Sequence, residues 1–375
     1  MVSSSEHTTG VTQEMAQAGV SPESSPSGTL DALVIGGGQA GLAMGYELAK
    51  RGMRFRVLDA GAEIGHVWQS RWDSLTLFTP AQYDNLPGLA FPAEPDTYPG
   101  KDDVADYLRT YATTFDLPIQ LGTEVNSLSR SDGVYIAKAS HGEFEAKQVV
   151  IATGPFHVPF IPAIGETLDP EVAQIHSADY RRPEQLPTGD VLVVGAGNSG
   201  CQIARELSAS RHVDLSVGKR IPTVPQRLLG HDLWWWGSGL GLTRRITVDS
   251  RLGRRLAGRD QIIGDGPKRL AKRHGVQLRP PATSSNGRTV HFKDGTSAEF
   301  AALVWATGFK VDHSWIDIPE AKDRRGDILQ ERGVTPSPGL YTLGLSWQHT
   351  RASALLGWVG DDAAYLSGVI ARMEA

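Results

Sequence analysis

The chain has 375 residues, with 37 lysines and arginines against 42 aspartates and glutamates, a formal net charge of −5, and 40% hydrophobic residues. This length exceeds one typical domain of about 100–200 residues and predicts two domains with sizeable cores. The negative balance gives no overall attraction to nucleic acid or anionic membranes, although basic residues cluster locally, and it favours a small-molecule partner.

The cysteine count and the N-terminus indicate the cellular environment in which the chain works. The only cysteine, Cys201, excludes an intramolecular disulfide and a Cys-rich metal framework, so we expect no metal and a reducing, cytoplasmic environment. No apolar run approaches the roughly 18 residues of a membrane-spanning helix. Residues 1–29 are rich in Ser, Thr and Glu, lack the features of a signal peptide, and are predicted to be a disordered tail.

The first motif is the stretch "ALVIGGGQAGLAMGYELAKRG", in which a short apolar strand is followed by a glycine-rich turn and a helix. Gly36 permits the tight turn, Gly38 lets a pyrophosphate approach the backbone, and Gly41 lets the helix pack on the strand. The next strand, "FRVLDAG", ends at Asp59, where an acid would bind a ribose hydroxyl. The candidate contacts of this dinucleotide site are Gly36, Gly38, Gln39, Ala40, Gly41 and Asp59.

The second motif, "VLVVGAGNSG" before the helix "CQIARELSAS", repeats this plan. Its following strand, "VDLSVGKR", has no acid at the ribose position and instead offers Lys219 and Arg220, which could hold a 2′-phosphate and so favour NADPH over NADH. The alternative is that both are solvated surface cations. The candidate contacts of the second site are Gly195, Gly197, Asn198, Ser199, Gly200, Lys219 and Arg220.

A second pair of similar segments extends the duplication. "GVYIAKASHGEFEAKQVVIATG" and "TVHFKDGTSAEFAALVWATGF" each predict paired strands around a turn, at His141–Gly142 and at Asp294–Gly295, followed by an apolar strand ending in Ala-Thr-Gly. We therefore predict an α/β fold with two Rossmann-like dinucleotide-binding domains, each a parallel sheet with a small antiparallel addition. Two dinucleotides without a redox-active cysteine pair indicate a flavin that is reduced by a nicotinamide.

The order of these motifs, with "GHVW" after the first loop and "HSADY" before the second, resembles the flavin-containing monooxygenase family, especially bacterial members similar to plant indole-pyruvate monooxygenases. The likeness covers the chain from about Ala32 to the C-terminus. It implies FAD in the first site, with Trp68 of "GHVW" among its contacts, and NADPH in the second. It also implies an FAD-binding domain of residues 30–162 and 310–375 and an NADPH-binding domain of residues 163–309.

The chain departs from the family pattern at three places. His66 replaces a glycine of the usual G-G-x-W, and the fingerprint F-x-G-x-x-x-H-x-x-x-[YF] keeps only its end, His176 and Tyr180. Phe78 falls where animal and yeast-type members place an asparagine beside the flavin. A polar group that helps to handle the oxygenated flavin in those enzymes is therefore absent here or supplied from elsewhere.

The resemblance implies a monooxygenase reaction with a small organic substrate and O2. NADPH reduces FAD, O2 adds to the reduced flavin as a C4a-hydroperoxide, and one oxygen atom passes to an amine, a sulfide, a ketone or a 2-oxo acid. The flavin does the chemistry, so no catalytic side chain is assigned. Two alternatives stay open: an NAD(P)H-dependent flavin reductase or oxidase that inserts no oxygen, and a redox-sensing module that binds both nucleotides without turnover.

Aromatic residues outside the loops have two interpretations. Trp72, Phe78 and Phe91 are favoured as core residues. The run Trp234–Trp236 cannot face inward as a whole, so we expect one or two of its rings at a substrate mouth or at the interface of a homodimer.

The second half of the chain contains two adjacent acids and one basic stretch that need an interpretation. Asp361 and Asp362 are predicted at the start of the last helix, where acids suit the helix dipole. The resemblance places this helix start against the flavin ring, whereas capping alone would also explain the two acids. The basic stretch "RRITVDSRLGRRLAGRDQ" has no interleaved aromatics and is predicted to lie on a solvated helical face.

Overall fold

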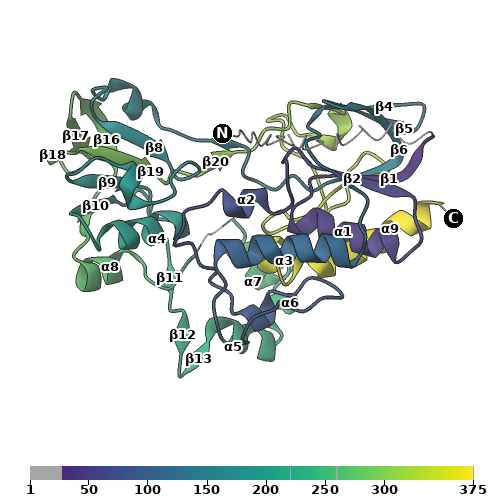
Figure 1. The fold of residues 1–375 in the computed structure, drawn as a ribbon, viewed down its shortest axis with the longest axis horizontal. Helices are drawn as coiled ribbons and strands as arrows, with labels where there is room; N and C mark the ends of the chain where they lie inside the picture. The colour runs from purple at the N-terminus through teal and green to yellow at the C-terminus, as the bar shows by residue number, and fades with distance from the viewer. Residues whose placement is uncertain (1–27, 220, 259–260, 375) are drawn as a thin grey trace, which may run out of the picture.

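Two β-sheets organise the part of the chain that the computed structural model describes, residues 28–219, 221–258 and 261–374. Figure 1 shows each sheet in its own body, with a narrower connection between the two. Apart from residues 28 and 29, the expected disordered tail lies outside the described residues. No helix within these ranges is long and apolar enough to cross a membrane.

The first sheet has a parallel centre flanked by an antiparallel hairpin. Its strand order is β21-β4-β5-β6-β1-β2-β3, and β22 also pairs with β6. The parallel pairs of this centre are β3–β2, β2–β1, β1–β6 and β6–β22. The antiparallel pairs are β4–β5 and β5–β6, so β6 belongs to both parts. The strands are β1 (Leu30–Ile35), β2 (Phe55–Leu58), β3 (Ile119–Gln120), β4 (Val125–Ser131), β5 (Val134–Ala139), β6 (Gly142–Ile151), β21 (Ile316–Asp317) and β22 (Leu340–Thr342).

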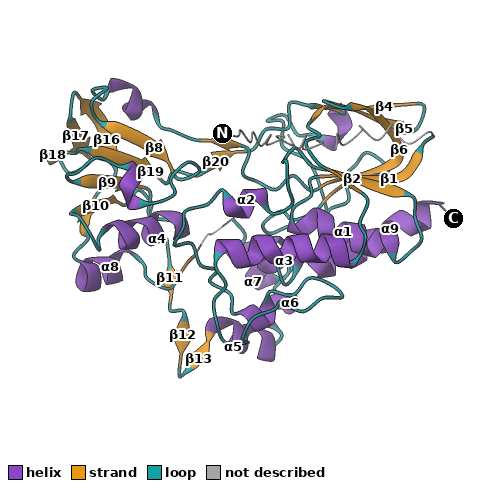
Figure 2. Ribbon diagram, in the orientation of Figure 1, coloured by secondary structure: helices purple, strands orange, loops and turns teal. Residues whose placement is uncertain are grey.

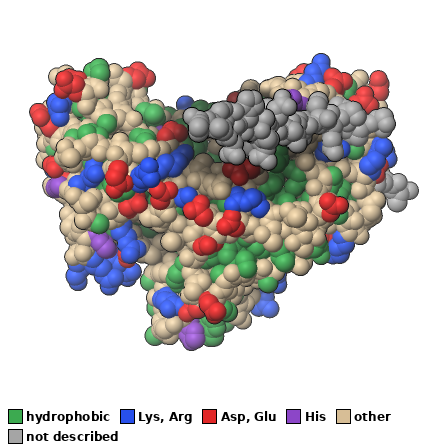
Figure 3. Space-filling model, in the orientation of Figure 1, with side chains coloured by type: hydrophobic (Ala, Val, Ile, Leu, Met, Phe, Trp, Pro, Cys, Tyr) green, Lys and Arg blue, Asp and Glu red, His purple; other side chains and the backbone are tan. Residues whose placement is uncertain are grey.

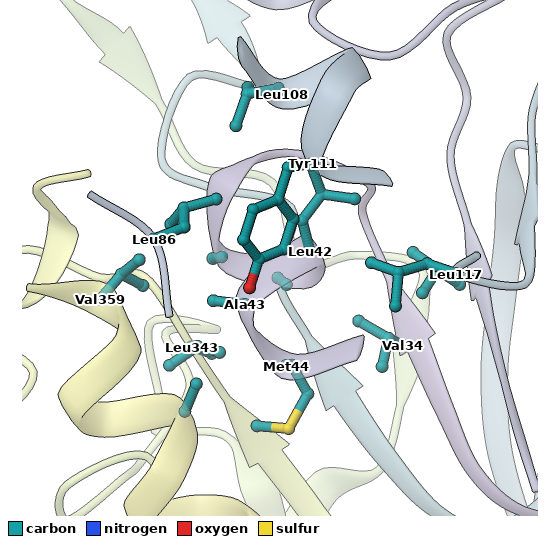
Figure 4. Close-up of a cluster of buried hydrophobic side chains, with 14 of the residues drawn as sticks. Val34, Leu42, Ala43, Met44, Leu86, Leu108, Tyr111, Leu117, Leu343 and Val359 are labelled. Carbon is teal, nitrogen blue, oxygen red and sulfur yellow. The ribbon is translucent and has the colours of Figure 1, made fainter. Parts of the chain in front are cut away.

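Helices α1 (Gln39–Ala49), α3 (Lys101–Thr114) and α9 (Val359–Glu374) cover one face of this sheet, as Figure 2 shows. Because successive side chains of a strand point to opposite faces, Val34 of β1 packs among these helices. In Figure 4, Leu42 of α1, Tyr111 of α3 and Val359 of α9 meet in this core. The core holds α1, and therefore the glycine loop before it, in a fixed position.

The opposite face of the first sheet packs against its hairpin. Leu33 and Ile35 of β1 lie in a second cluster with Tyr135 of β5 and Phe144 of β6. Both faces of β1 are therefore buried, which is why its last four residues, Ala32–Ile35, are a continuous apolar run.

The second sheet is entirely parallel, in the order β15-β10-β9-β19-β8. Val191 and Val193 of β9 face helices α4 and α8, and Leu192 and Val194 face a three-stranded antiparallel sheet. The elements are β8 (Ala173–His176), β9 (Val191–Val194), α4 (Asn198–Leu207), β10 (Val213–Ser216), α8 (Pro267–His274), β15 (Gln277–Arg279), β16 (Ala282–Asn286), β17 (Thr289–Phe292), β18 (Ser297–Glu299) and β19 (Ala302–Trp305).

A long insertion between β10 and β15 leaves the second sheet and packs on the first body. Its Trp234 lies against Trp358, with ring centroids 4.9 Å apart, and the backbone N–H of Val248 donates to the His349 carbonyl at 2.8 Å. The insertion contains β11 (Thr223–Val224), β12 (Arg227–Leu228), β13 (His231–Asp232), α5 (Leu233–Gly239), α6 (Leu242–Arg245), α7 (Arg251–Leu256) and β14 (Ile262–Ile263).

Short elements complete the connections. In the narrow connection, β7 and β20 run antiparallel, so the chain leaves the first body and returns to it side by side. The remaining elements are α2 (His66–Gln69), β7 (Val158–Pro159), β20 (Phe309–Lys310) and 3₁₀ turns at Ala81–Tyr83, Ala163–Thr167, Pro183–Gln185, Pro319–Ala321 and Arg351–Ala354.

The predicted fold class is confirmed: two Rossmann-like units, each with an antiparallel addition. One turn differs from the prediction, because Gly142 already pairs with Ala139 and the two-residue turn is therefore Ser140–His141. The division into residues 30–162 with 310–375 and residues 163–309 remains our proposal. Its boundaries follow the two sheets, while the insertion contacts the first unit as well as its own.

Candidate dinucleotide sites

The first glycine loop contains two glycines that the fold requires and one that it does not. Gly36 has φ +108°, and a Cβ there would lie 2.5 Å from the Ala152 carbonyl oxygen. A Cβ on Gly41 would lie 1.8 Å from the Gly36 carbonyl oxygen. A Cβ on Gly38 would meet no atom within 4 Å, so nothing in the described chain requires glycine at this position.

The second loop repeats this geometry glycine for glycine. Gly195 has φ +104°, and its Cβ would lie 2.3 Å from the Ala306 carbonyl oxygen. A Cβ on Gly200 would lie 1.9 Å from the Gly195 oxygen, while a Cβ on Gly197 would meet nothing within 4 Å. Each Ala-Thr-Gly segment thus supplies the carbonyl against which its loop is packed.

The open space at Gly38 and Gly197 fits a bound pyrophosphate. Both residues are the N-caps of helices, α1 and α4, and neither end is closed by a capping side chain. Backbone N–H groups at a helix start bind phosphate, and the absence of a side chain lets the phosphate come close. The residues present therefore fit a dinucleotide at both loops.

Gln39 and Asn198, at equivalent positions of the two loops, use their side chains within the protein. Gln39 Nε2 donates to the Ala354 carbonyl at 2.8 Å. Asn198 Nδ2 donates to the Gln261 carbonyl at 3.2 Å, and its Oδ1 accepts from the backbone N–H of Ile263 at 3.0 Å. Cofactor contact by these two residues, and by Ala40 and Ser199 after them, thus remains a prediction for their backbone N–H groups.

Asp59 is buried beside the first loop and fixes its shape. Its Oδ2 accepts from the backbone N–H of Gly37 at 2.5 Å, and its Oδ1 accepts from that of Gly61 at 2.8 Å. His66 Nδ1 lies 3.6 Å from the same carboxylate, and a Cβ on Gly61 would lie 2.1 Å from that nitrogen. His66 therefore covers the turn after β2. Trp68 from the same short helix packs against the first core, and its flavin contact stays a prediction.

The register of the two sheets shows which residue stands in place of Asp59 in the second unit. The backbone N–H of Asp59 donates to Gln120 of the neighbouring strand at 3.0 Å, and that of Val217 donates to Arg279 at 2.9 Å. Both residues directly follow the strand that comes after the glycine loop and its helix, β2 in the first unit and β10 in the second. Val217 is therefore the counterpart of Asp59, and the second site has no acid for a ribose diol.

Lys219 follows two residues later and is exposed beside this position. An exposed ammonium group at the end of this strand is suited to a 2′-phosphate. Arg220 lies outside the described residues, so its part in the second site remains a sequence prediction.

The "HSADY" segment forms hydrogen bonds to the Ala-Thr-Gly segment and to helix α4 of the second unit. The backbone N–H of Ala178 donates to His176 Nδ1 at 3.1 Å, so Nε2 holds the proton that reaches the Gly308 carbonyl at 3.0 Å. Burial lowers the pKa of His176 and favours this neutral form. Tyr180 donates to Glu206 of α4 at 2.7 Å. Both retained fingerprint residues therefore have structural partners around the second loop.

Aromatic side chains meet where the insertion contacts the first unit. Phe78 stacks on Trp234 with centroids 6.2 Å apart, and the Phe78 carbonyl accepts from Trp234 Nε1 at 3.0 Å. Trp72 and Phe91 are core residues, as expected, although Trp72 belongs to the core of the second unit. In the triple-tryptophan run, Trp234 is buried and its neighbour Trp235 is exposed, as the sequence predicted for such a run.

Two buried acids near this aromatic contact were missed by the sequence analysis. Asp232 accepts from Tyr98 at 2.7 Å and from Gln226 at 2.9 Å. Asp84 accepts from Thr79 at 2.5 Å, and burial raises its pKa to about 7, helped by the charge of Asp232. Asp84 has polar neighbours in the sequence, Gln82 and Asn85, so no local pattern indicated its burial.

The start of α9 lies beside a cavity of about 310 Å³ whose lining includes both predicted acids. Asp361 pairs with Arg244 of the insertion at 2.8 Å, and the buried Asp362 lies 3.6 Å from Arg332 Nε. Burial raises the pKa of Asp362. The two acids therefore do more than cap the helix, because each faces an arginine. Contact of the helix start with a flavin remains a prediction.

These paired loops define the class of protein. A family model described as pyridine nucleotide-disulphide oxidoreductase matches residues 33–222, half of the chain, and the chain belongs to this family. Disulfide chemistry has no support in the residues, because the only cysteine is buried and burial raises the pKa of its thiol to about 12.

Within this class, the chain is similar to uncharacterised oxidoreductases and to flavin monooxygenases. The chain is 46% identical over 338 residues to an uncharacterized CzcO-like oxidoreductase of Geobacillus kaustophilus (strain HTA426), covering 90% of this chain and 97% of that protein. It is 27% identical over 384 residues to a probable indole-3-pyruvate monooxygenase of Arabidopsis thaliana, covering 90% and 89%. A flavin-containing monooxygenase from Stenotrophomonas maltophilia has a similar structure, with a TM-score of 0.77, 29% identity, and 92% and 99% coverage.

The resemblance seen in the sequence is thereby confirmed: the chain is similar to flavin-containing monooxygenases in both sequence and fold. It is an enzyme of the flavin-dependent oxidoreductase type, with a flavin and a nicotinamide as its cofactors.

Proposed function

We propose that the chain is an FAD-dependent, NADPH-consuming monooxygenase that inserts one atom of O2 into a small organic substrate. The observation that carries this proposal is that two loops of the same geometry are followed by strands that end in different residues. Both leave open space at the middle glycine, but the first is followed by Asp59 and the second by Val217 and Lys219. An acid suits the ribose diol of FAD, and a cation without an acid suits the 2′-phosphate of NADPH.

FAD would lie along the first unit. Its pyrophosphate would sit at Gly38 and the start of α1, and Asp59 would orient its ribose while holding the loop through Gly37. A bound flavin supplies the redox chemistry of oxygen transfer. The protein then has to place the nicotinamide, the substrate and O2 against it and exclude water from the reaction.

NADPH would lie along the second unit, with its pyrophosphate at Gly197 and its 2′-phosphate at Lys219 and Arg220. Asn198 ties this loop to Gln261 and Ile263 at the end of the insertion, and the same insertion reaches Phe78 and Trp358 of the first unit. The insertion therefore contacts both units and would help to hold the two nucleotides relative to each other.

The substrate class is an amine, a sulfide or a carbonyl compound. Phe78, where some relatives of this family carry an asparagine, gives the aromatic contact with Trp234 an apolar character. An apolar surface of this kind suits the hydrocarbon part of a small substrate.

The test separates oxygen insertion from simple electron transfer. The purified, FAD-loaded protein is given NADPH, isotopically labelled O2 and a panel of amines, sulfides and ketones, and product mass and NADPH consumption are measured. We expect one labelled oxygen atom in the product for each NADPH consumed. A second measurement replaces O2 with an artificial electron acceptor under anaerobic conditions. Undiminished NADPH oxidation there, together with no labelled product from any substrate in the presence of O2, would instead support the flavin reductase.

A further inference from the structure

The insertion ends in an apolar protrusion on the surface of the molecule. The β12–β13 hairpin and α5 form the lowest projection in Figure 1, and hydrophobic side chains break the surface over it in Figure 3. Leu229 at the hairpin tip is 81% exposed. The other large hydrophobic side chains exposed on residues 227–258, which we call the insertion tip, are Leu228, Trp235, Leu240, Leu242 and Leu252.

The apolar side chains of the insertion tip are held outward by the structure beneath them. Trp236 Nε1 donates to the Leu228 carbonyl at 3.0 Å, and the His231 ring stacks on Trp235 at 4.1 Å. The neighbouring Trp234 is buried and anchors α5 to the first unit. These contacts fix the backbone at Leu228 and the ring of Trp235 on the surface of the tip.

The insertion tip carries a net positive charge, whereas the whole chain carries a net negative charge. Residues 227–258 contain six arginines and two aspartates, of which Asp232 is buried. Two of the arginines, Arg227 and Arg244, pair with Asp96 and Asp361 outside this segment, so the positive charge of the tip rests mainly on the other four. The short helices α6 and α7, which follow α5, carry five exposed arginines: Arg244, Arg245, Arg251, Arg254 and Arg255. The whole chain has a net charge of −5, so this concentration of positive charge is local.

We propose that the insertion tip is a membrane-contacting surface, which seats its leucines and Trp235 at the headgroup boundary of an anionic lipid bilayer. Projecting apolar side chains bordered by arginines match the two attractions that bind proteins to such surfaces, apolar burial and charge. A second copy of the chain fits less well. A two-fold contact through this tip would bring two convex surfaces and two groups of arginines against each other.

The test is flotation of the full, FAD-loaded chain with vesicles of phosphatidylcholine alone and with about 30% phosphatidylserine. We expect the anionic vesicles to carry the protein at low salt and to release most of it at roughly 0.5 M salt, where charges are screened. The double variant Leu228→Ser with Leu229→Ser should bind at least about tenfold more weakly. Arg254→Gln with Arg255→Gln should bind roughly 25-fold more weakly, since each basic residue contributes about fivefold.

Matched controls remove the same side-chain types elsewhere. Lys272→Gln with Arg273→Gln on α8 deletes two exposed cations, and Leu121→Ser with Leu329→Ser deletes two exposed leucines, and both should bind as the parent does. Flavin absorbance verifies that each variant is folded. No flotation at low salt, equal binding to neutral vesicles, or equal losses in the controls would overturn the proposal. A dimer that the Leu228 and Leu229 changes convert to monomer would overturn it in favour of a second copy.

Discussion

The two glycine loops have nearly the same backbone and different surroundings. In both, the first glycine has a positive φ and packs on an Ala-Thr-Gly carbonyl, and the third packs on the first. They differ one strand further on, where Asp59 holds the first loop and Val217 occupies the equivalent position of the second. We therefore expect the loop geometry to fix where a pyrophosphate fits and the strand end to decide which ribose is accepted.

The largest expected effect concerns the glycines that the fold itself requires. Gly41→Ala would place a Cβ 1.8 Å from the Gly36 carbonyl oxygen, and Gly200→Ala would do the same at 1.9 Å from Gly195. Both contacts are with backbone, so neither can relax cheaply, and we expect little soluble, folded protein from either variant. Circular dichroism and thermal melting measure this. Melting temperatures equal to the parent's would show that the loops are looser than described.

The next effect concerns the cations of the second site. Lys219→Ala with Arg220→Ala should weaken NADPH by about ten- to a hundredfold or more, because a charge-assisted contact contributes roughly 1.5–3 kcal/mol. NADH has no 2′-phosphate and should be almost unaffected. Steady-state kcat/KM for both nucleotides decides the matter, with Lys272→Ala and Arg273→Ala on α8 as the control. Equal losses for NADPH and NADH would assign the two cations to the fold.

A smaller effect should follow from making the second strand end like the first. Val217→Asp puts a carboxylate at the counterpart of Asp59, where it can accept from a ribose 2′-hydroxyl and repel a 2′-phosphate. We expect roughly a tenfold gain in kcat/KM for NADH and a loss for NADPH. Val217→Asn is the matched control, since it keeps the size without the charge. An unchanged preference would mean that this strand end does not face the ribose.

The smallest effect concerns the side chains that tie the loops to other segments. Gln39→Ala removes one hydrogen bond, to Ala354, and Asn198→Ala removes two, to Gln261 and Ile263. At about 1 kcal/mol for each bond, we expect Asn198→Ala to destabilise the protein by about twice as much. Urea unfolding at constant flavin content measures both. If Asn198→Ala proved the milder change, the insertion would not depend on this contact.

Much of the fold could be predicted because its signals are local. The strand, glycine turn and helix of each unit follow one another within a single stretch, and their glycines need no distant partner to be recognised. The strands flanking Ser140–His141 were also predicted, but the turn was placed one residue late because strand pairing extends to Gly142. Pairing is decided across the hairpin and not by the turn residues alone.

Contacts between distant segments could not be predicted in this way. Nothing near Trp234 in the sequence indicates that it packs on Phe78 and Trp358 of the other unit. In the same way, Gln39 and Asn198 look like simple loop residues, whereas the structure uses their side chains to hold Ala354 and the end of the insertion. Such tertiary hydrogen bonds depend on where the chain returns, which local patterns do not contain.

The most direct test of the assignment compares the visible absorption of two matched variants. Gly38→Ala and Gly197→Ala each add one methyl group to open space, so both should fold, and each should obstruct only the pyrophosphate of its own site. We predict that Gly38→Ala is purified without flavin colour, while Gly197→Ala keeps stoichiometric FAD and shows a steeply raised KM for NADPH. A yellow Gly38→Ala protein beside a colourless Gly197→Ala protein would contradict the account and exchange the two sites.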